Sequence, residues 1–344
     1  MKGIIFTGDR TLEVRDFPIP EPGPGEVLLK VMASGICGSD LHVWRGAQAM
    51  AHVAGHEPSG IVAAVGPGMM RLQVGDRVTV HHHQGCGVCP ACAGGEVVLC
   101  TNKLLSGVQT GGSFAEYCLA RERACVPLGD SLSFIDGAFM ACVGGTAYGA
   151  YKRMAPWPWQ SVAIFGLGPV GLSCALVGKA LGLRVVGMDI FPDRRAAAAN
   201  CGLDLIVDGT QEDVVAQIRA FGRGPGGWWG DGVDNLIETS GATAARELMI
   251  PVIRREGTIV IVGVGGTDKV INPSQIHGSA CHLIGSVVYK LDWMWELARF
   301  MATSGLTFEP AVTHRLPLDQ AEEAFRLADE GRCGKIVFLP HGAA

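Results

Sequence analysis

The 344-residue sequence has few charged residues, and neither sign of charge is concentrated anywhere in it. Asp, Glu, Lys and Arg together make up 18% of the chain, and its formal net charge is −5. No basic or acidic block is present in either half. Because nucleic-acid binding needs a clustered basic surface, the composition gives no support for a nucleic-acid partner.

An export signal and an uninterrupted hydrophobic span are also missing. Met1–Thr7 has one early lysine and an apolar run too short for a signal peptide. Met154–Gly178 carries no charge, but prolines and glycines interrupt it, so a buried strand, a glycine turn and a buried helix explain it better than a bilayer span of ~20 residues. We therefore expect a cytoplasmic protein without a membrane partner, whose thiols stay reduced.

Glycine and cysteine, in contrast, are abundant. The 49 glycines are about twice the usual share of ~7%, yet they form no fixed period, which predicts many tight turns and close backbone approaches. In a reducing compartment, the 12 cysteines favour metal ligation or catalysis over disulfides.

The length suggests two domains, at ~150 residues each. Residues 1–150 read as mostly β, with Val- and Ile-rich runs separated by Pro- and Gly-rich turns. From Ser161 onward, short buried strands alternate with helical stretches, which predicts βαβ units and a parallel sheet. The predicted strands are Ser161–Phe165, Arg184–Met188, Asp204–Val207, Val233–Ile237, Thr258–Val262 and His282–Val287. The predicted helices are Val170–Leu181, Asp193–Asn200, Glu212–Phe221 and Ala242–Ile253, followed by Leu291–Thr303, Asp319–Glu330 and a last strand, Lys335–Leu339.

A glycine-rich turn follows the first strand of this alternating region. Gly166, Gly168 and Gly171, with Pro169 and Val170 between them, match the dinucleotide fingerprint, in which a pyrophosphate lies on a helix N-terminus. Asp189 follows 18 residues after Gly171, at the end of the next strand. An acid there binds ribose hydroxyls and repels a 2′-phosphate, so NAD is favoured over NADP. We also predict that Arg194, Val262 and Val264 contribute to cofactor binding.

Four cysteines occur at a spacing typical of a closed zinc site. Cys86, Cys89, Cys92 and Cys100 offer four thiolates, which suit a tetrahedral structural zinc that holds a loop. An iron–sulfur cluster or four unligated cysteines are the alternatives, although the spacing differs from the usual cluster motifs.

Three further residues, Cys37, His56 and Cys142, are not convincing as metal ligands by spacing alone. The order of the motifs, however, including Gly55-His-Glu57, the four-cysteine lobe, the fingerprint and Gly334-Lys-Ile-Val, resembles the zinc-dependent medium-chain alcohol, threonine and polyol dehydrogenases over essentially the whole chain. This resemblance implies that Cys37, His56 and Cys142 bind a catalytic zinc. Ala141 stands where polyol and threonine dehydrogenases place a glutamate, so the pattern is closer to the alcohol dehydrogenase type.

The resemblance also assigns roles to residues around the two sites. Glu57 matches the acid beside the metal, and Asp40 the acid that orients the ligand histidine. Ser39 and His42 match a proton relay, with a turn serine and a surface histidine as the alternative. Arg332 resembles an arginine that reaches the cofactor pyrophosphate.

His81, His82 and His83 are consecutive, and side chains alternate across a strand, so we expect that all three cannot serve one site. By the same resemblance, His82 falls at a substrate-pocket wall position, and His83 where threonine dehydrogenases carry a pocket histidine. A surface face with one hydrogen-bonded partner is the alternative.

The sequence pattern predicts an α/β protein with a Rossmann doubly wound parallel sheet and a mainly β domain, and the resemblance implies that the β domain is the GroES-like catalytic domain. The expected domains are 1–150 with the zinc lobe at 86–100, an NAD-binding domain at 151–287, and a return to the catalytic domain at 288–344. The expected activity is zinc-dependent hydride transfer between an alcohol (a secondary alcohol, polyol or amino alcohol) and NAD, with two zinc ions per chain. The resemblance suggests a homodimer or homotetramer; a non-catalytic NAD- and zinc-binding redox sensor is the alternative function.

Overall fold

The computed structural model describes residues 1–223, 230–266 and 271–342, which form two compact units. The first unit comprises Met1–Gly145, Lys290–Glu330 and Lys335–Ala344, and the second comprises Thr146–Tyr289 and Gly331–Gly334. The sequence predicts 288–344 as part of one domain, whereas Gly331–Gly334 lies in the second unit.

The first unit contains a seven-stranded sheet that is antiparallel apart from one pair. Its order is β16-β17-β3-β4-β5-β9, and β8 also pairs with β3. Only β16 and β17 run parallel. The strands are β3 (Glu26–Gly35), β4 (Pro58–Val65), β5 (Arg77–Val80), β8 (Tyr117–Arg121), β9 (Cys125–Pro127), β16 (Val312–Leu316) and β17 (Lys335–Phe338).

Two small two-stranded sheets and several helices complete this unit. Sheet β1-β2 is formed by Lys2–Gly8 and Thr11–Asp16, and sheet β6-β7 by His83–Gln84 and Leu104–Leu105. The helices are α1 (Gly38–Trp44), α2 (Pro90–Ala93), α3 (Phe134–Ala141), α11 (Leu291–Ser304) and α12 (Ala321–Asp329), while α4 (Val143–Met154) begins here and continues into the second unit. The apolar side chains of β3, β4, β5 and β8 form a buried core.

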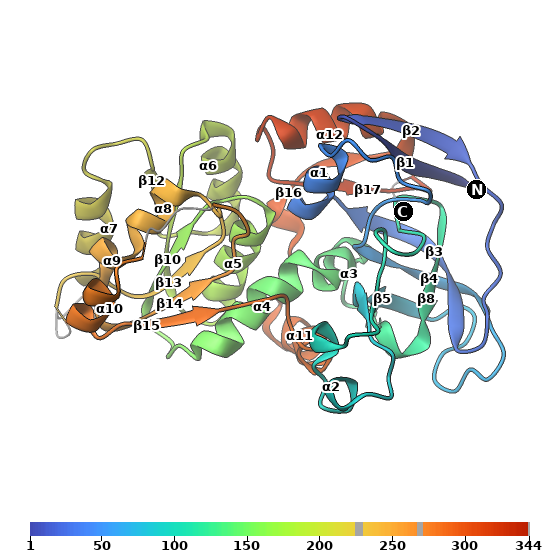
Figure 1. Ribbon diagram of the computed structural model, residues 1–344. Helices are drawn as coiled ribbons and strands as arrows, with labels where there is room; N and C mark the ends of the chain where they lie inside the picture. Colours follow the sequence, from blue (N-terminus) through green and yellow to red (C-terminus); the bar gives the residue numbers. More distant parts are fainter. Residues whose placement is uncertain (224–229, 267–270, 343–344) are drawn as a thin grey trace. The chain divides into compact units, whose positions relative to one another are not determined.

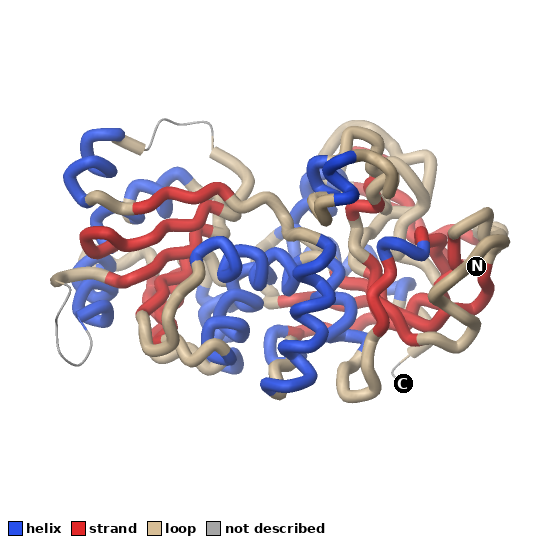
Figure 2. Tube along the Cα trace, turned by 90° about the horizontal axis from the view of Figure 1, so that it is seen from below, coloured by secondary structure: helices blue, strands red, loops and turns tan. Residues whose placement is uncertain are grey.

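The second unit is a doubly wound parallel sheet, which confirms the predicted fold class. Its strand order is β12-β11-β10-β13-β14-β15, and every neighbouring pair is parallel. Helices α5 and α6 cover one face, and α7, α9 and α10 the other (Figures 1 and 2). The strands are β10 (Ser161–Phe165), β11 (Arg184–Asp189), β12 (Leu205–Asp208), β13 (Val233–Glu238), β14 (Ile253–Ile261) and β15 (His282–Gly285). The helices are α5 (Pro169–Ala180), α6 (Pro192–Ala198), α7 (Val214–Arg223), α8 (Thr243–Glu247), α9 (Met249–Val252) and α10 (Pro273–Ser279).

One predicted helix is wrong in its extent. The sequence predicts a single helix over Ala242–Ile253, but the structure has two short helices, α8 and α9, and Ile253 already begins β14. Pro251 has no N–H to donate to the carbonyl of Glu247, so the helix cannot continue regularly through this point. No helix in the described parts of the chain is long and apolar enough to cross a membrane.

Candidate metal centres and cofactor site

The candidate catalytic ligands lie beyond the ends of two inner strands, β3 and β4, of the sheet in the first unit. Ser34 near the end of β3 pairs with Pro58 at the start of β4, so the segments that carry Cys37 and His56 run side by side. Cys142 follows directly after α3, which packs against β3 and β4. Register and helix packing therefore bring together residues that are far apart in the sequence.

The ligand atoms of Cys37, His56, Glu57 and Cys142 all lie within 4.8 Å of one another. The Sγ atoms of Cys37 and Cys142 are 3.9 Å apart. Thiolates, imidazole and carboxylate are the donors that bind zinc in proteins. The structure thus gathers the three predicted ligands with Glu57, although their assignment to a metal stays a prediction.

Asp40 orients two of these residues through one buried carboxylate. Its Oδ1 atom lies 2.9 Å from His56 Nδ1, and its Oδ2 atom accepts a 2.8 Å hydrogen bond from the backbone N–H of Cys37. Since a carboxylate only accepts, His56 carries its proton on Nδ1 and presents Nε2 as the ligand atom. Burial lowers the pKa of His56, but Asp40 and Cys37 together raise it well above its usual value in the metal-free site.

Lys335 completes the surroundings of Glu57, and sequence reasoning missed its role. Its Nζ atom lies 2.5 Å from Glu57 Oε2 and donates a 2.8 Å hydrogen bond to the carbonyl of Ile36. Both charged side chains are fully buried. The signal in the sequence was a lysine at the start of the otherwise apolar strand Lys335–Phe338.

The residues around Glu57 fit a bound cation. Glu57 Oε1 is buried and has no hydrogen-bond partner among the residues that the structure describes. Burial raises the pKa of Glu57, and the Lys335 ammonium only partly opposes that rise. The buried, unpartnered Oε1 atom beside two cysteines and a histidine is the observation that fits a divalent ion here.

The predicted relay residues lie on α1, which begins directly after Cys37. Ser39 Oγ is 3.5 Å from His56 Nε2, so the hydroxyl lies at the metal-facing side of the histidine. His42 is exposed and three residues further along, on the same face of the helix as Ser39. Both residues are exposed, and Ser39 lies beside the buried His56, which is compatible with a relay that stays a prediction.

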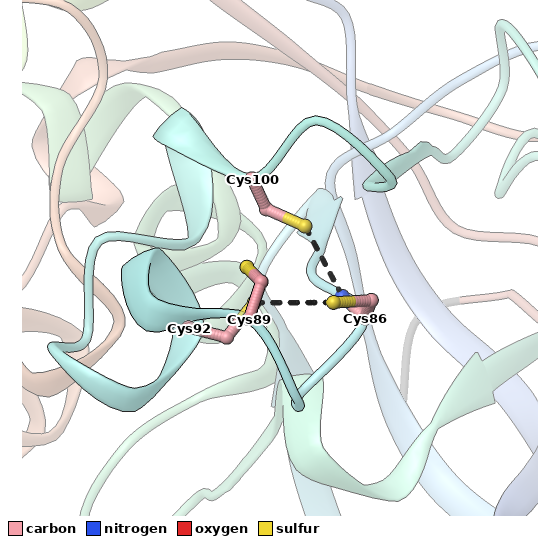
Figure 3. Close-up of side chains that lie close together, drawn as sticks. All are labelled: Cys86, Cys89, Cys92 and Cys100. Carbon is pink, nitrogen blue, oxygen red and sulfur yellow. Dashed lines mark hydrogen bonds between the residues drawn. The ribbon is translucent and has the colours of Figure 1, made fainter.

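The four-cysteine lobe is a second cluster of metal-ligating atoms (Figure 3). The sulfur atoms of Cys86, Cys89, Cys92 and Cys100 all lie within 4.8 Å of one another, and those of Cys86 and Cys92 are 4.0 Å apart. Backbone N–H groups at Val88 and Cys89 lower the pKa of Cys86 to about 6, whereas burial raises the pKa of Cys92 to about 11. All four predicted structural ligands therefore converge, and no water position remains in a Cys₄ set.

The structure differs from our expectation for the three consecutive histidines. One ligand nitrogen from each of His81, His82 and His83 lies within 4.8 Å of the other two. Strand β5 ends at Val80, the chain bends at His82, and β6 starts at His83. Because the segment is not one regular strand, the alternation of side chains does not separate the rings.

In the second unit, the glycine turn has the form that a dinucleotide requires. Gly166 has φ 91°, and a Cβ on Gly171 would lie 1.9 Å from the Gly166 carbonyl oxygen, so neither position accepts a larger residue without strain. A Cβ on Gly168, in contrast, would meet nothing within 4 Å, which leaves open space at the N-terminus of α5. Pro169 and Val170 are the first two residues of that helix. The turn thus offers a cradle for a pyrophosphate.

Asp189 is held at the end of β11 by this same turn. Its Oδ2 atom accepts a hydrogen bond from the N–H of Leu167 (2.7 Å), and its Oδ1 atom accepts one from Phe191 (2.9 Å). Arg194 lies 3.7 Å from the carboxylate and has a buried Nε atom without a partner among the described residues. A carboxylate and a guanidinium group therefore lie side by side where the adenosine ribose is expected to bind.

The other predicted cofactor residues, Val262, Val264 and Arg332, lie outside the glycine turn. The N–H of Val262 donates to the Glu238 carbonyl at 2.8 Å, whereas Val264 is almost fully exposed. Arg332 belongs to the second unit and lies 3.6 Å from Asp193, at the start of α6. Their contact with a cofactor stays a prediction.

Comparison with known proteins accounts for both units. Residues 23–130 match the family model described as the alcohol dehydrogenase GroES-like domain, and residues 169–303 match the zinc-binding dehydrogenase model. The chain is 35% identical to the uncharacterized zinc-type alcohol dehydrogenase-like protein YphC of Escherichia coli K12, with 98% of each chain covered. It is 33% identical to an L-threonine 3-dehydrogenase of Rhizobium etli CIAT 652, with 95% of this chain and 94% of the relative covered.

A solved structure agrees with these matches. The alcohol dehydrogenase TADH from Thermus sp. ATN1 superposes with a TM-score of 0.89 at 28% identity, covering 98% of this chain and 99% of the other. The predicted combination of a GroES-like and a Rossmann-like domain is thereby confirmed. The chain belongs to the zinc-dependent medium-chain alcohol dehydrogenase family, whose members are oxidoreductases.

Proposed function

We propose that this protein is an NAD-dependent alcohol dehydrogenase that oxidises a secondary alcohol, a polyol or an amino alcohol to the ketone or aldehyde. The observation that carries the proposal is the convergence of Cys37, His56, Glu57 and Cys142 within 4.8 Å. No observation favours a redox sensor, since a sensor has no need of an acid-oriented histidine beside two cysteines.

Cys37, His56 and Cys142 would hold one zinc ion, and the four cysteines of the 86–100 lobe would hold a second. Zinc in the first site would supply a Lewis acid that lowers the pKa of the alcohol hydroxyl. Asp40 keeps His56 in the ligating tautomer, and the buried Lys335 fixes the orientation of Glu57.

Ser39 and His42 would remove the hydroxyl proton. Ser39 would take it at Oγ, and His42, which is exposed, would release it to solvent. The two side chains are one helical turn apart on α1. Their positions support a path that leads away from the buried metal ligands.

The glycine turn, Asp189, Arg194 and Arg332 would bind NAD, which accepts the hydride. The open space at Gly168 admits the pyrophosphate, and the carboxylate of Asp189 accepts hydrogen bonds from ribose hydroxyls. Arg194 beside Asp189 tempers the repulsion of a 2′-phosphate, so we expect preference for NAD and not absolute exclusion of NADP.

The test is a substrate screen with matched metal analysis. Simple secondary alcohols, polyols and amino alcohols, including L-threonine because one relative is a threonine dehydrogenase, would be offered with NAD, and NADH formation recorded. We expect turnover with at least one class and two zinc ions per chain. A protein that holds two zinc ions but reduces NAD with none of these alcohols would contradict the proposed activity.

We further propose that the protein is a homodimer or homotetramer, and analytical ultracentrifugation would determine which.

A further inference from the structure

A cluster of three imidazoles remains unassigned next to the candidate catalytic site. His81 and His82 are buried and His83 is partly buried, and one ligand nitrogen from each lies within 4.8 Å of the others. The rings of His81 and His82 are stacked 5.3 Å apart, and those of His82 and His83 are 4.4 Å apart. Three neighbouring imidazoles are a donor set that first-row divalent ions bind well.

We propose that His81, His82 and His83 form a third metal site, which binds a divalent transition-metal ion such as Zn²⁺ or Co²⁺ through three imidazole nitrogens, with water completing the coordination. This site is separate from the four-cysteine lobe and from Cys37, His56 and Cys142. It does not depend on the identity of the alcohol substrate.

The surroundings of His82 and His83 indicate which of their nitrogens could bind an ion. His82 Nδ1 donates to the carbonyl of Ala141 at 2.8 Å, because a carbonyl only accepts; the lone pair of the neutral ring is therefore on Nε2. His83 Nδ1 is buried and has no hydrogen-bond partner among the described residues. A buried ring nitrogen without a polar partner is the second observation that points to a ligand at this place.

His81 is the ligand that we expect to contribute least. Its Nδ1 atom accepts a 3.1 Å hydrogen bond from the backbone N–H of His83, so coordination through this atom replaces an existing interaction. Removal of His83 or His82 should therefore weaken the site more than removal of His81. A nonspecific cluster of histidines would show no such difference among the three substitutions, so the ranking distinguishes a defined metal site from it.

The experiment adds Co²⁺ to the purified full-length protein whose zinc content has been measured. Co²⁺ is chosen because its visible absorption reports coordination, while retained zinc shows that the other sites stay filled. We expect one Co²⁺ per chain beyond the zinc already present, and no loss of zinc. The affinity for this ion should fall by about tenfold or more in His83→Gln and His82→Gln, since even indirect ligand partners contribute ~10–100-fold, and by less in His81→Gln.

His277→Gln is the matched control, because His277 is exposed on α10 in the other unit and should not affect Co²⁺ uptake. A wild-type protein that takes up no additional ion, or a His83→Gln variant that binds it as tightly as wild type, would overturn the proposal.

X-ray absorption of cobalt-loaded wild type provides a test without variants. A first shell of nitrogen and oxygen is expected, and sulfur ligands would overturn the site. Since metal count and coordination are measured without turnover, failure here is distinguishable from failure of the proposed dehydrogenase activity.

Discussion

The Nζ atom of Lys335 lies 2.5 Å from Oε2 of Glu57, and neither side chain has any surface exposed to solvent. The two residues are 278 positions apart in the sequence. Their contact joins β17, the last strand along the chain, to the segment that carries His56. Glycine at position 35 makes room for them, because a Cβ there would lie 2.3 Å from the Glu57 carboxylate.

Removing the lysine should be costly for stability. In Lys335→Met, the Glu57 carboxylate loses its buried partner, and breaking such a pair typically costs about 3–5 kcal/mol. The free energy of unfolding, measured by denaturant titration of the zinc-loaded protein, should fall by an amount in this range. Arg326→Met is the matched control, since it removes exposed ion pairs with Glu323 and Glu330 and should change stability by less than about 1 kcal/mol. Equal effects of the two substitutions would argue against a special role for the buried pair.

The two metal centres should have separable roles. Cys89→Ser removes one of the four proposed lobe ligands, so it should mainly reduce stability or solubility. His56→Ala removes a proposed ligand of the catalytic zinc, and turnover should be abolished while the fold is retained. Elemental analysis, circular dichroism and NADH formation on the same samples are the measurements. Wild-type protein that is active with one zinc ion or none per chain is the contrary outcome.

Cofactor preference should depend on Asp189. Asp189→Gly removes the carboxylate that we propose binds ribose hydroxyls and repels a 2′-phosphate, so the ratio of kcat/KM for NAD to that for NADP should decrease. Asp189→Asn is the control for shape, because it keeps an acceptor for the N–H of Leu167 while removing the charge. If the wild-type protein has the higher kcat/KM with NADP, the role given to this strand end is wrong.

His42 should act on proton release and not on metal binding. We expect His42→Ala to keep both zinc ions and its affinity for NAD, and to lose activity by about 10²-fold or less, because water can replace an outer relay member. The loss should be largest below neutral pH, where the alkoxide forms least readily, and should shrink as the pH rises.

The measurement is kcat/KM against pH for both proteins, with added imidazole as a rescue arm. Imidazole in the buffer should restore part of the rate of the variant. A variant that has lost a zinc ion would make His42 a ligand or a structural residue. A pH profile identical to that of wild type would mean that the proton leaves by another path.

Local patterns made part of this architecture predictable from the sequence. The glycine turn before α5 and the four cysteines between residues 86 and 100 are each contained in a short stretch, so their spacing alone indicates their chemistry. The parallel sheet was predictable because its buried strands alternate with helices. The ends of helices α8 and α9 were not, since one proline competes there with an otherwise helical composition.

Contacts between distant segments could not be predicted in the same way. Nothing near Glu57 in the sequence indicates that Lys335 will lie beside it, because that contact depends on the pairing of β17 with β3. The three histidines show the opposite difficulty. Their positions are adjacent, but a bend at His82, which the strand-like composition does not reveal, decides that their rings converge.

The pairing of Ser34 with Pro58 has a consequence for how the chain folds. Cys37 and His56 leave the ends of two antiparallel strands, and a strand advances about 3.4 Å per residue. A slip of two residues between β3 and β4 keeps the same side chains facing inward, so hydrophobic patterning alone discriminates weakly against it. It would, however, shift the two ligands by about 7 Å relative to each other, beyond the 4.8 Å within which they now lie. An ion that binds both therefore selects the native alignment of the strands, so that refolding with zinc should give fewer misaligned molecules than refolding with a chelator.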